Sequence, residues 1–111
     1  SNELGVPMII TAIPMRYQII EKDREATFEN GPLKEEYFEL FRPQNFMEEK
    51  ANQFGLIYVD FASAFSSAEK APHEYFFAAP DIHWNAAGHG LAARELKKTV
   101  DPLIIEYGKN K

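Results

Sequence analysis

The 111-residue sequence contains no cysteine, which excludes a disulfide framework, a thiolate metal site and a cysteine nucleophile. Positive charge is also scarce, because twelve Lys and Arg residues stand against seventeen Asp and Glu residues and the formal net charge is -5. General nucleic-acid binders and membrane-surface binders need a basic face, so this balance argues against both classes. The sequence also lacks an apolar run of the ~18 residues that a membrane span needs, and it shows no signal-peptide pattern.

The sequence does contain an ordinary globular composition. It is 45% hydrophobic with nine Phe and five Tyr residues, which excludes disordered and fibrous classes. Its length allows one small domain. Ser1–Asn2 is typical of a cloning scar, and the chain then runs almost directly into a predicted strand. We therefore expect residues 1–111 to be a partial domain whose N-terminal half is missing.

Two short apolar runs predict the strands of a parallel sheet. Residues 6–13 (VPMIITAI) show no alternation, which is typical of a strand buried on both faces. Residues 56–61 (LIYVDF) are apolar until Asp60. Strand, helices and strand make a βαβ unit with a right-handed crossover, so the predicted class is α/β. Because two strands alone are marginal, we expect a missing part of the chain or a second copy to cover the sheet edge.

Two apolar stripes predict helices between the strands. The first stripe consists of Leu33, Tyr37, Phe38 and Phe41. The second consists of Phe46, Met47, Ala51 and Phe54. Pro43 either ends the first helix or starts the second as a first-turn proline. Gly55 suits the left-handed residue that ends the second helix.

The remaining segments predict loops and one long helix. Residues 15–32 are polar and predict a loop with a turn or a helix start, and residues 62–80 predict a long connection. A last helix is expected from Asn85 to about residue 100. Its inner stripe consists of Leu91, Leu96, Val100 and Leu103 or Ile104. Asp101–Pro102 either kinks this helix or caps a final short one.

The segment Pro80–His83 carries the residues best suited to chemistry. Pro80 keeps its predecessor extended, and we expect an extended chain up to the next helix. Side chains at i and i+2 of an extended chain leave the same face, so Asp81 and His83 lie side by side. A carboxylate that accepts a hydrogen bond from one ring nitrogen fixes the tautomer and leaves the other nitrogen as a base. We therefore predict a carboxylate oxygen within ~2.6–3.2 Å of a ring nitrogen.

The helix that follows supports this interpretation. Asn85 is a good N-cap for a helix that starts at Ala86. The partial positive charge of that helix start keeps the His83 ring neutral, while Asp81 acts in the opposite direction. This combination suits a general base near neutral pH. The alternative is a hydrogen-bonded pair that only staples the loop to the helix.

Residues 81–93, DIHWNAAGHGLAA, resemble the last conserved block of the SGNH (GDSL-type) hydrolase family. The upstream pattern is also similar, with one strand ending in Ile13–Pro14, then a helix and Phe54–Gly55, and a second strand ending in Val59–Asp60. The resemblance implies the C-terminal half of a flavodoxin-like, three-layer α/β/α hydrolase with a short parallel sheet. It also implies that Asp81 and His83 belong to a Ser-His-Asp triad.

Two departures from the family pattern matter. The spacing is Asp81-x-His83 rather than the commoner Asp-x-x-His, a shorter form that resembles branches acting on acyl groups of cell-surface polysaccharides. The Gly-Asp-Ser block and the Gly and Asn blocks of the oxyanion hole are absent. We interpret Ser63, Ser66 and Ser67 as loop or cap residues, because they follow the second strand, and Asn30–Gly31 as a turn.

Three further residues are candidate substrate contacts. Trp84 follows His83 directly, and either packs beside the site or walls a sugar or acyl pocket. Arg16 and Tyr17 lie just past the first strand, on the side where ligands bind in parallel sheets. They either border a substrate pocket or form a solvated loop.

The remaining polar candidates have simpler interpretations. Asp60 ends a strand on the ligand side, and we expect it to bond a loop amide. His89 is interpreted as structural or partly exposed, and His73 as a surface residue. A metal site built from His83, Asp81 and either of these histidines matches no ligand spacing that we can justify.

The leading interpretation is a segment of a serine esterase or acyltransferase. His83 is then the base, Asp81 orients it, and the serine lies outside this chain. The expected substrates are carboxylic esters, O-acetylated carbohydrates among them, with no metal or organic cofactor. We expect the isolated chain to be inactive, and to form a homodimer or associate with its missing half. The alternative is a noncatalytic interaction module or remnant that binds a partner through the open sheet edge.

Overall fold

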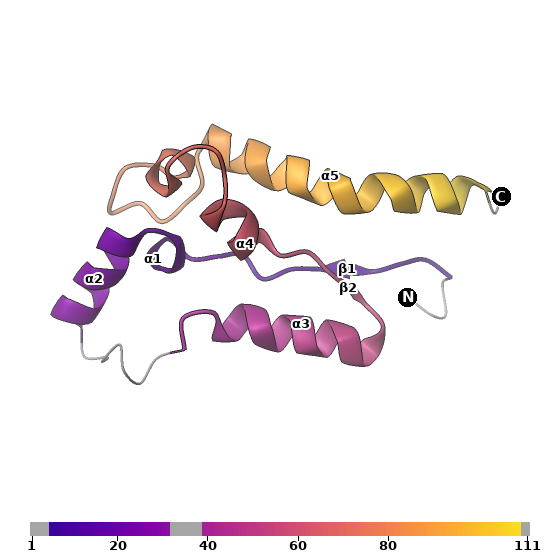
Figure 1. The fold of residues 1–111 in the computed structure, drawn as a ribbon, viewed down its shortest axis with the longest axis horizontal. Helices are drawn as coiled ribbons and strands as arrows, with labels where there is room; N and C mark the ends of the chain where they lie inside the picture. Colours follow the sequence, from indigo (N-terminus) through magenta and orange to yellow (C-terminus); the bar gives the residue numbers. More distant parts are fainter. Residues whose placement is uncertain (1–4, 32–38, 110–111) are drawn as a thin grey trace.

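The computed structural model describes residues 5–31 and 39–109 of a mixed α/β fold that is mostly helical (Figure 1). Its strands are β1 (Ile9–Ile10) and β2 (Ile57–Tyr58). Its helices are α1 (Arg16–Ile19), α2 (Glu21–Asn30), α3 (Arg42–Phe54), α4 (Phe61–Ser66), the short 3-10 helix η2 (Pro72–Tyr75) and α5 (Ala86–Lys109). The predicted α/β class is therefore confirmed at this coarse level.

The two strands form a parallel pair, as the sequence predicts. Ile9 lies opposite Ile57, and Ile10 lies opposite Tyr58. All four residues are only half-buried, so the expectation of a strand buried on both faces is wrong. Within the described residues no third strand joins this sheet. One edge of β1 therefore has no β-sheet partner there.

Both strands are shorter than the predicted runs 6–13 and 56–61. The last backbone bond between them joins the Val59 N–H to the Ile10 carbonyl at 3.0 Å. Beyond it, the Thr11 hydroxyl donates to the Val59 carbonyl at 2.6 Å. Because a side chain takes the place of the next backbone donor, regular pairing ends there and the two chains diverge into α1 and α4.

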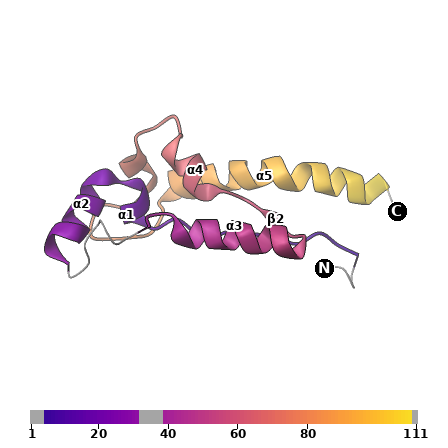
Figure 2. The same cartoon turned by 60° about the horizontal axis from the view of Figure 1, so that its bottom comes forward.

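Helices lie on both sides of the strand pair. In Figure 1, α3 and α5 run along opposite sides of β1 and β2, and in Figure 2, where α3 overlaps the strands, α5 lies apart from them. α3 packs against β2, whereas α5 packs against α4 and η2. Because the strands are parallel, their C-terminal ends share one edge, and α1 and α4 begin just beyond it. The polar loops described below lie at this end of the molecule.

The expected loop at residues 15–32 contains two helices instead, α1 and α2. α2 buries no residue, so the apolar periodicity of a packed helix is missing from its sequence. Most of that sequence, EKDREATFEN, consists of the good helix formers Glu, Lys, Arg and Ala. The prediction was wrong because it relied on periodicity, whereas composition and the polar bonds of Asp23 and Arg24 to α1 stabilise this helix.

A pair of buried amides joins α1 to α3. Gln18 and Gln44 are 2% and 4% exposed, and each side-chain N–H donates to the other side chain's carbonyl at 3.0 Å. Gln18 also donates to the Leu40 carbonyl and accepts from the Met15 backbone N–H, both at 2.7 Å. Buried polar groups are costly unless they are hydrogen-bonded. This paired arrangement therefore fixes α1 just beyond the C-terminal end of β1.

α3 begins and ends as the sequence predicts. Pro43 lies in its first turn, so it starts this helix rather than ending an earlier one. Gly55 ends the helix in the left-handed conformation, with φ of 71°. The helix expected at 33–41 falls largely outside the described residues, and its described part, residues 39–41, is not helical.

The apolar stripe expected on α3 is only partly correct. Ala51 is fully buried, whereas Phe46 and Phe54 are 54% and 63% exposed. Gln44 and Ala51, seven residues apart, share the buried face, and Phe46 points away from it. The error arose because the buried position at the start of the helix is taken by a polar residue, Gln44, which the Gln18 amide satisfies.

The hydrophobic core lies between α1, α4, η2 and the first half of α5. Its buried residues are Ile19, Ile20, Val59, Phe61, Ala62, Phe65, Tyr75, Phe76 and Ala92. Phe65, which is 1% exposed, is the largest fully buried side chain. It belongs to α4, in the segment that the sequence predicted as a long connection. The core therefore supports the loops at the C-terminal edge of the strands.

α5 continues for 24 residues, through Pro102, so no separate last helix forms. Gly88 and Ala92 are its buried residues, whereas Ile104 and Ile105 near its end are 62% and 60% exposed. Of the predicted stripe, Leu91, Val100 and Leu103 are half-buried whereas Leu96 is exposed, so the stripe prediction is correct in part. None of the described helices is both long and apolar enough to cross a membrane.

Candidate active site

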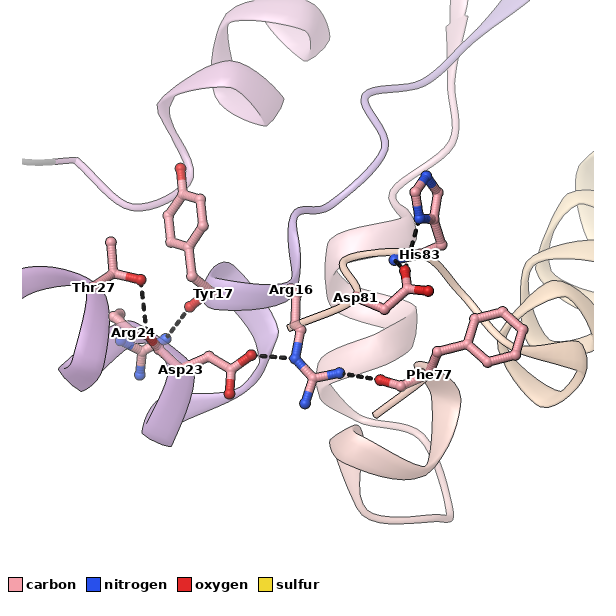
Figure 3. Close-up of polar contacts among 8 residues, drawn as sticks. All are labelled: Arg16, Tyr17, Asp23, Arg24, Thr27, Phe77, Asp81 and His83. Atoms are coloured by element: carbon pink, nitrogen blue, oxygen red, sulfur yellow. Dashed lines mark hydrogen bonds and ion pairs between the residues drawn. The ribbon is translucent and has the colours of Figure 1, made fainter. Parts of the chain in front are cut away.

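Asp81 and His83 form the contact that their spacing predicts. Oδ1 of Asp81 lies 2.7 Å from Nδ1 of His83 and also accepts the backbone N–H of His83 at 2.9 Å (Figure 3). The Asp81 backbone N–H donates to the Ala78 carbonyl at 3.1 Å, which closes a turn before the pair. Local geometry therefore holds the carboxylate against the ring, and the predicted distance is confirmed.

The chemistry of the two groups assigns the proton between them. An ionised carboxylate only accepts hydrogen bonds, so Nδ1 of His83 donates and carries the hydrogen. Nε2 then keeps its lone pair in the neutral ring, and no hydrogen-bond partner for it is found among the described residues. The His83 side chain is 78% exposed and that of Asp81 is 46% exposed. The pair thus presents an oriented basic nitrogen to solvent.

The surroundings of Asp81 keep its carboxyl group ionised. The backbone N–H of His83 is the main cause that lowers the pKa of Asp81 from its ordinary value of 3.8, and the ring hydrogen bond is the second. The positive charge of Arg16 acts in the same direction, while partial desolvation acts against it. A carboxylate that stays ionised near neutral pH continues to orient the ring.

Asn85 fixes the other end of the segment that carries His83. Its Oδ1 accepts the Gly88 N–H at 3.0 Å, which confirms the predicted N-cap of α5. Its Nδ2 donates to the carbonyls of Glu74 at 2.8 Å and Phe76 at 3.0 Å. One side chain therefore ties the start of α5 to η2 and to the residue after it, a role that the sequence did not disclose.

The glycine at position 88 is required by a close backbone approach. A Cβ atom there would lie 2.2 Å from the Tyr75 carbonyl oxygen and 2.9 Å from Cβ of Trp84. Both distances are far below van der Waals contact, so α5 packs this closely on η2 only with glycine at this position. The glycine of the DIHWNAAG segment thus serves the packing beneath the pair.

Trp84 is a packing residue at the edge of the core. Its half-buried ring lies 4.9 Å from the ring of Phe65 and 5.9 Å from that of Phe61, centroid to centroid, in edge-on arrangements. Its backbone forms an antiparallel bridge with Phe76. The packing alternative is confirmed, and a contact between Trp84 and substrate stays a prediction.

Arg16 and Tyr17 line a cavity of about 270 Å³, which lies between α2 and the loop before His83. The other lining residues are Met15, Asp23, Ala26, Thr27, Ala79, Pro80 and Ile82. Arg16 is buried, so the solvated-loop interpretation is wrong for this residue. The sequence did not indicate Asp23 as its ion-pair partner, because residues 15–32 were expected to form a loop, whereas Arg16 and Asp23 lie on two successive helices. Binding of substrate by Arg16 or Tyr17 stays a prediction.

The local serines and Asp60 have structural roles. Asp60 is the N-cap of α4, where it accepts the Ser63 N–H at 3.0 Å and the Ser63 hydroxyl at 2.6 Å. The Ser67 hydroxyl donates to the Ser63 carbonyl at 2.7 Å at the end of α4. Ser66 is exposed in the last position of that helix. The cap interpretation of Ser63 and Ser67 and the amide bond expected of Asp60 are confirmed.

The other two histidines lie apart from the pair. His73 is exposed in η2, and His89 is exposed on α5 with its ring 5.5 Å from that of Trp84, edge-on. In the part of the chain that the structure describes, no three His, Asp or Glu side chains are grouped to hold a metal ion.

Comparisons with protein-family models, curated proteins and solved structures found no match for this chain.

Proposed function

We propose that this chain supplies the base and the orienting acid of a Ser-His-Asp triad in an SGNH-type serine esterase or acyltransferase. The observation that carries the proposal is the 2.7 Å contact between Oδ1 of Asp81 and Nδ1 of His83, with Nε2 open to solvent. The resemblance of residues 81–93 to the family's last block supports the same assignment. The substrate class is a carboxylic ester, an acylated carbohydrate among the candidates.

In the proposed reaction, Nε2 of His83 removes the proton from a serine hydroxyl as the serine oxygen attacks the ester carbonyl. The carbonyl electrons move onto its oxygen to give the tetrahedral intermediate. On collapse, the leaving alkoxide takes the proton from Nε2 and an acyl-serine remains. Water or a sugar hydroxyl then attacks the acyl-serine with the same proton transfers. Asp81 stays ionised and stabilises the imidazolium throughout.

The attacking serine and the oxyanion donors are proposed to lie outside residues 1–111. Ser63 and Ser67 are engaged as cap residues, and no hydrogen bond joins His83 to a serine among the described residues. The free edge of β1 and the helices on both sides of the strands are compatible with half of a flavodoxin-like, three-layer domain. A complementary half-domain, or a second copy of the chain, would cover that edge.

The kinetic test compares variants of the natural full-length protein on p-nitrophenyl acetate. We expect His83→Ala to lower kcat by roughly 10³–10⁶ and Asp81→Asn by about 10⁴, on the precedent of other triads. His73→Ala is the matched control, because His73 is exposed on η2, and it should leave kcat unchanged. If His83→Ala leaves the activity unchanged, the proposal is overturned, and the pair serves only to hold the loop against the helix.

The isolated 111-residue chain provides a second test. It should show no saturable turnover of p-nitrophenyl acetate, because a base without a nucleophile and oxyanion donors gives no acyl-enzyme. Saturable turnover that depends on His83 would mean that a serine within this chain is the nucleophile, and the location proposed for the serine would be wrong. A full-length protein without serine-dependent activity would favour the interaction module.

A further inference from the structure

Arg16, at the start of α1, is a buried cation with one partner on the neighbouring helix α2 and another 61 residues along the chain. Its side chain is 11% exposed, and such a charge is costly to bury unless it is paired and hydrogen-bonded. Nε pairs with the Asp23 carboxylate of α2, and Nη1 donates to the Phe77 carbonyl at 2.5 Å (Figure 3). The guanidinium carbon lies 5.7 Å from the centroid of the Phe76 ring. Arg16 therefore joins α1 and α2 to the chain that follows η2.

That junction leads directly to the Asp81–His83 pair. The Phe77 backbone N–H donates to the His83 carbonyl at 3.1 Å, so residues 77–83 form a closed loop. Phe77 therefore makes both bonds: its carbonyl accepts from Arg16, and its N–H donates to the His83 carbonyl. Residues 77–83 are all exposed, and the other restraints on the loop are the turn bond from Asp81 to Ala78 and, at its base, the bridge between Phe76 and Trp84. The backbone of His83 is thus linked to Arg16 through one residue, Phe77, on the side of the loop opposite Trp84 and Asn85.

We infer that Arg16 is a positioning residue for the Asp81–His83 pair, acting through Phe77, with Asp23 orienting its guanidinium group. The fork of the guanidinium suits this role, because one edge faces a carboxylate while another N–H reaches a carbonyl. A lysine ammonium is a compact point charge and does not reproduce that fork. This inference rests on the proposed function only for its effect on catalysis, since the positioning itself is measurable without activity.

The test is the ¹⁵N spectrum of the His83 ring. In the wild-type protein at a pH where the ring is neutral, we expect the Nδ1–H tautomer that the Asp81 contact selects. Arg16→Gln should shift the ring toward the tautomer mixture of a free histidine, because the loop loses its anchor at Phe77. Arg16→Lys keeps the positive charge and should show the same shift. It is also the milder variant for folding, which circular dichroism checks.

The matched control is Arg24→Gln. Arg24 donates to the carbonyls of Tyr17 and Gln18 and so supports the same pair of helices, and among the described residues no hydrogen bond joins it to residues 77–83. We expect Arg24→Gln to lower stability while the His83 tautomer stays as in the wild type. If Arg16 had only a structural role, Arg16→Gln and Arg24→Gln would both lower stability and would leave the His83 tautomer unchanged. Equal spectra for Arg16→Lys and the wild type would overturn the inference.

Activity separates this inference from the proposed function. In the natural full-length protein Arg16→Lys should lower kcat by about 10²-fold with little change in KM, as expected when a catalytic group is displaced by about 1 Å. An unchanged kcat together with a loss of activity in His83→Ala would refute the role of Arg16 alone. If His83→Ala leaves activity intact, the proposed function fails, and the tautomer spectra still decide whether Arg16 positions the pair.

Discussion

Replacement of Asn85 by alanine tests how the structure holds the segment that carries Asp81 and His83. Asn85 caps α5 through Oδ1 and donates through Nδ2 to the carbonyls of Glu74 and Phe76. Alanine removes the cap and both donors at once. The start of α5 then loses its side-chain bonds to the η2 region, whereas the backbone bond from residue 85 to the Tyr75 carbonyl and the apolar core beneath are unchanged.

The expected cost follows from these three bonds. Loss of an N-cap costs about 1 kcal/mol, and each lost neutral hydrogen bond costs roughly 1 kcal/mol more where the partner finds no water. Glu74 is exposed and its carbonyl has access to water, whereas Phe76 is 4% exposed. We therefore expect Asn85→Ala to lower the free energy of unfolding by about 2–3 kcal/mol. For a domain of this size that lowers Tm by roughly 10–15 °C.

Urea and thermal unfolding followed by circular dichroism measure this effect. Asn85→Asp keeps the capping oxygen and loses both donors, so it should show about half or more of the loss. Asn52→Ala is the control, because Asn52 is exposed on α3, and it should change stability by less than about 0.5 kcal/mol. A cost for Asn85→Ala as small as that of the control would refute the role assigned to these bonds.

Three further predictions address packing, buried polarity and charge. Gly88→Ala should destabilise the fold by about 1–3 kcal/mol, because its Cβ would meet the backbone of η2. Gly108→Ala, whose Cβ would meet nothing within 4 Å, should instead stabilise α5 by up to about 1 kcal/mol. Equal effects of the two substitutions in urea unfolding would contradict the close packing at Gly88. Gln18→Leu should cost about 1–3 kcal/mol by leaving the buried Gln44 amide unpaired. Gln44→Leu should cost less, because Gln18 keeps its bonds to Leu40 and Met15, and a double-mutant cycle should give a coupling free energy clearly different from zero. The pKa of Asp81, followed by NMR of its carboxyl carbon, should lie below 3.8. The ionised form then stabilises the folded loop above about pH 4, and this contribution is lost as pH falls through the lowered pKa. A pKa of Asp81 at or above the ordinary value would contradict its hydrogen bonds to His83.

Features with local causes could be predicted from the sequence. The Asp81–His83 contact depends on i, i+2 spacing, and the Asn85 cap depends on a residue type just before a helix. Pro43 and Gly55 delimit α3 for the same kind of reason, since their backbone preferences act at their own positions. The parallel pairing of the strands followed from two apolar runs with helices between them.

Features with distant causes could not be predicted. The burial of Arg16 depends on a carbonyl 61 residues away, and that of Gln18 on an amide 26 residues away. Nothing near either residue in the sequence indicates such a partner, so both are typical of solvated positions when read locally. α2 was missed for a related reason, because a helix without a buried face leaves no apolar period to detect.

The central claim is that His83 activates a serine nucleophile, and labelling with a fluorophosphonate probe tests it most directly. The probe reacts covalently with a serine that a neighbouring base has activated, and mass spectrometry locates the modified residue. For the natural full-length protein, the account predicts one labelled serine outside residues 1–111, with labelling abolished by His83→Ala and unchanged by His73→Ala. The absence of any labelled serine, or labelling that persists in His83→Ala, would contradict it.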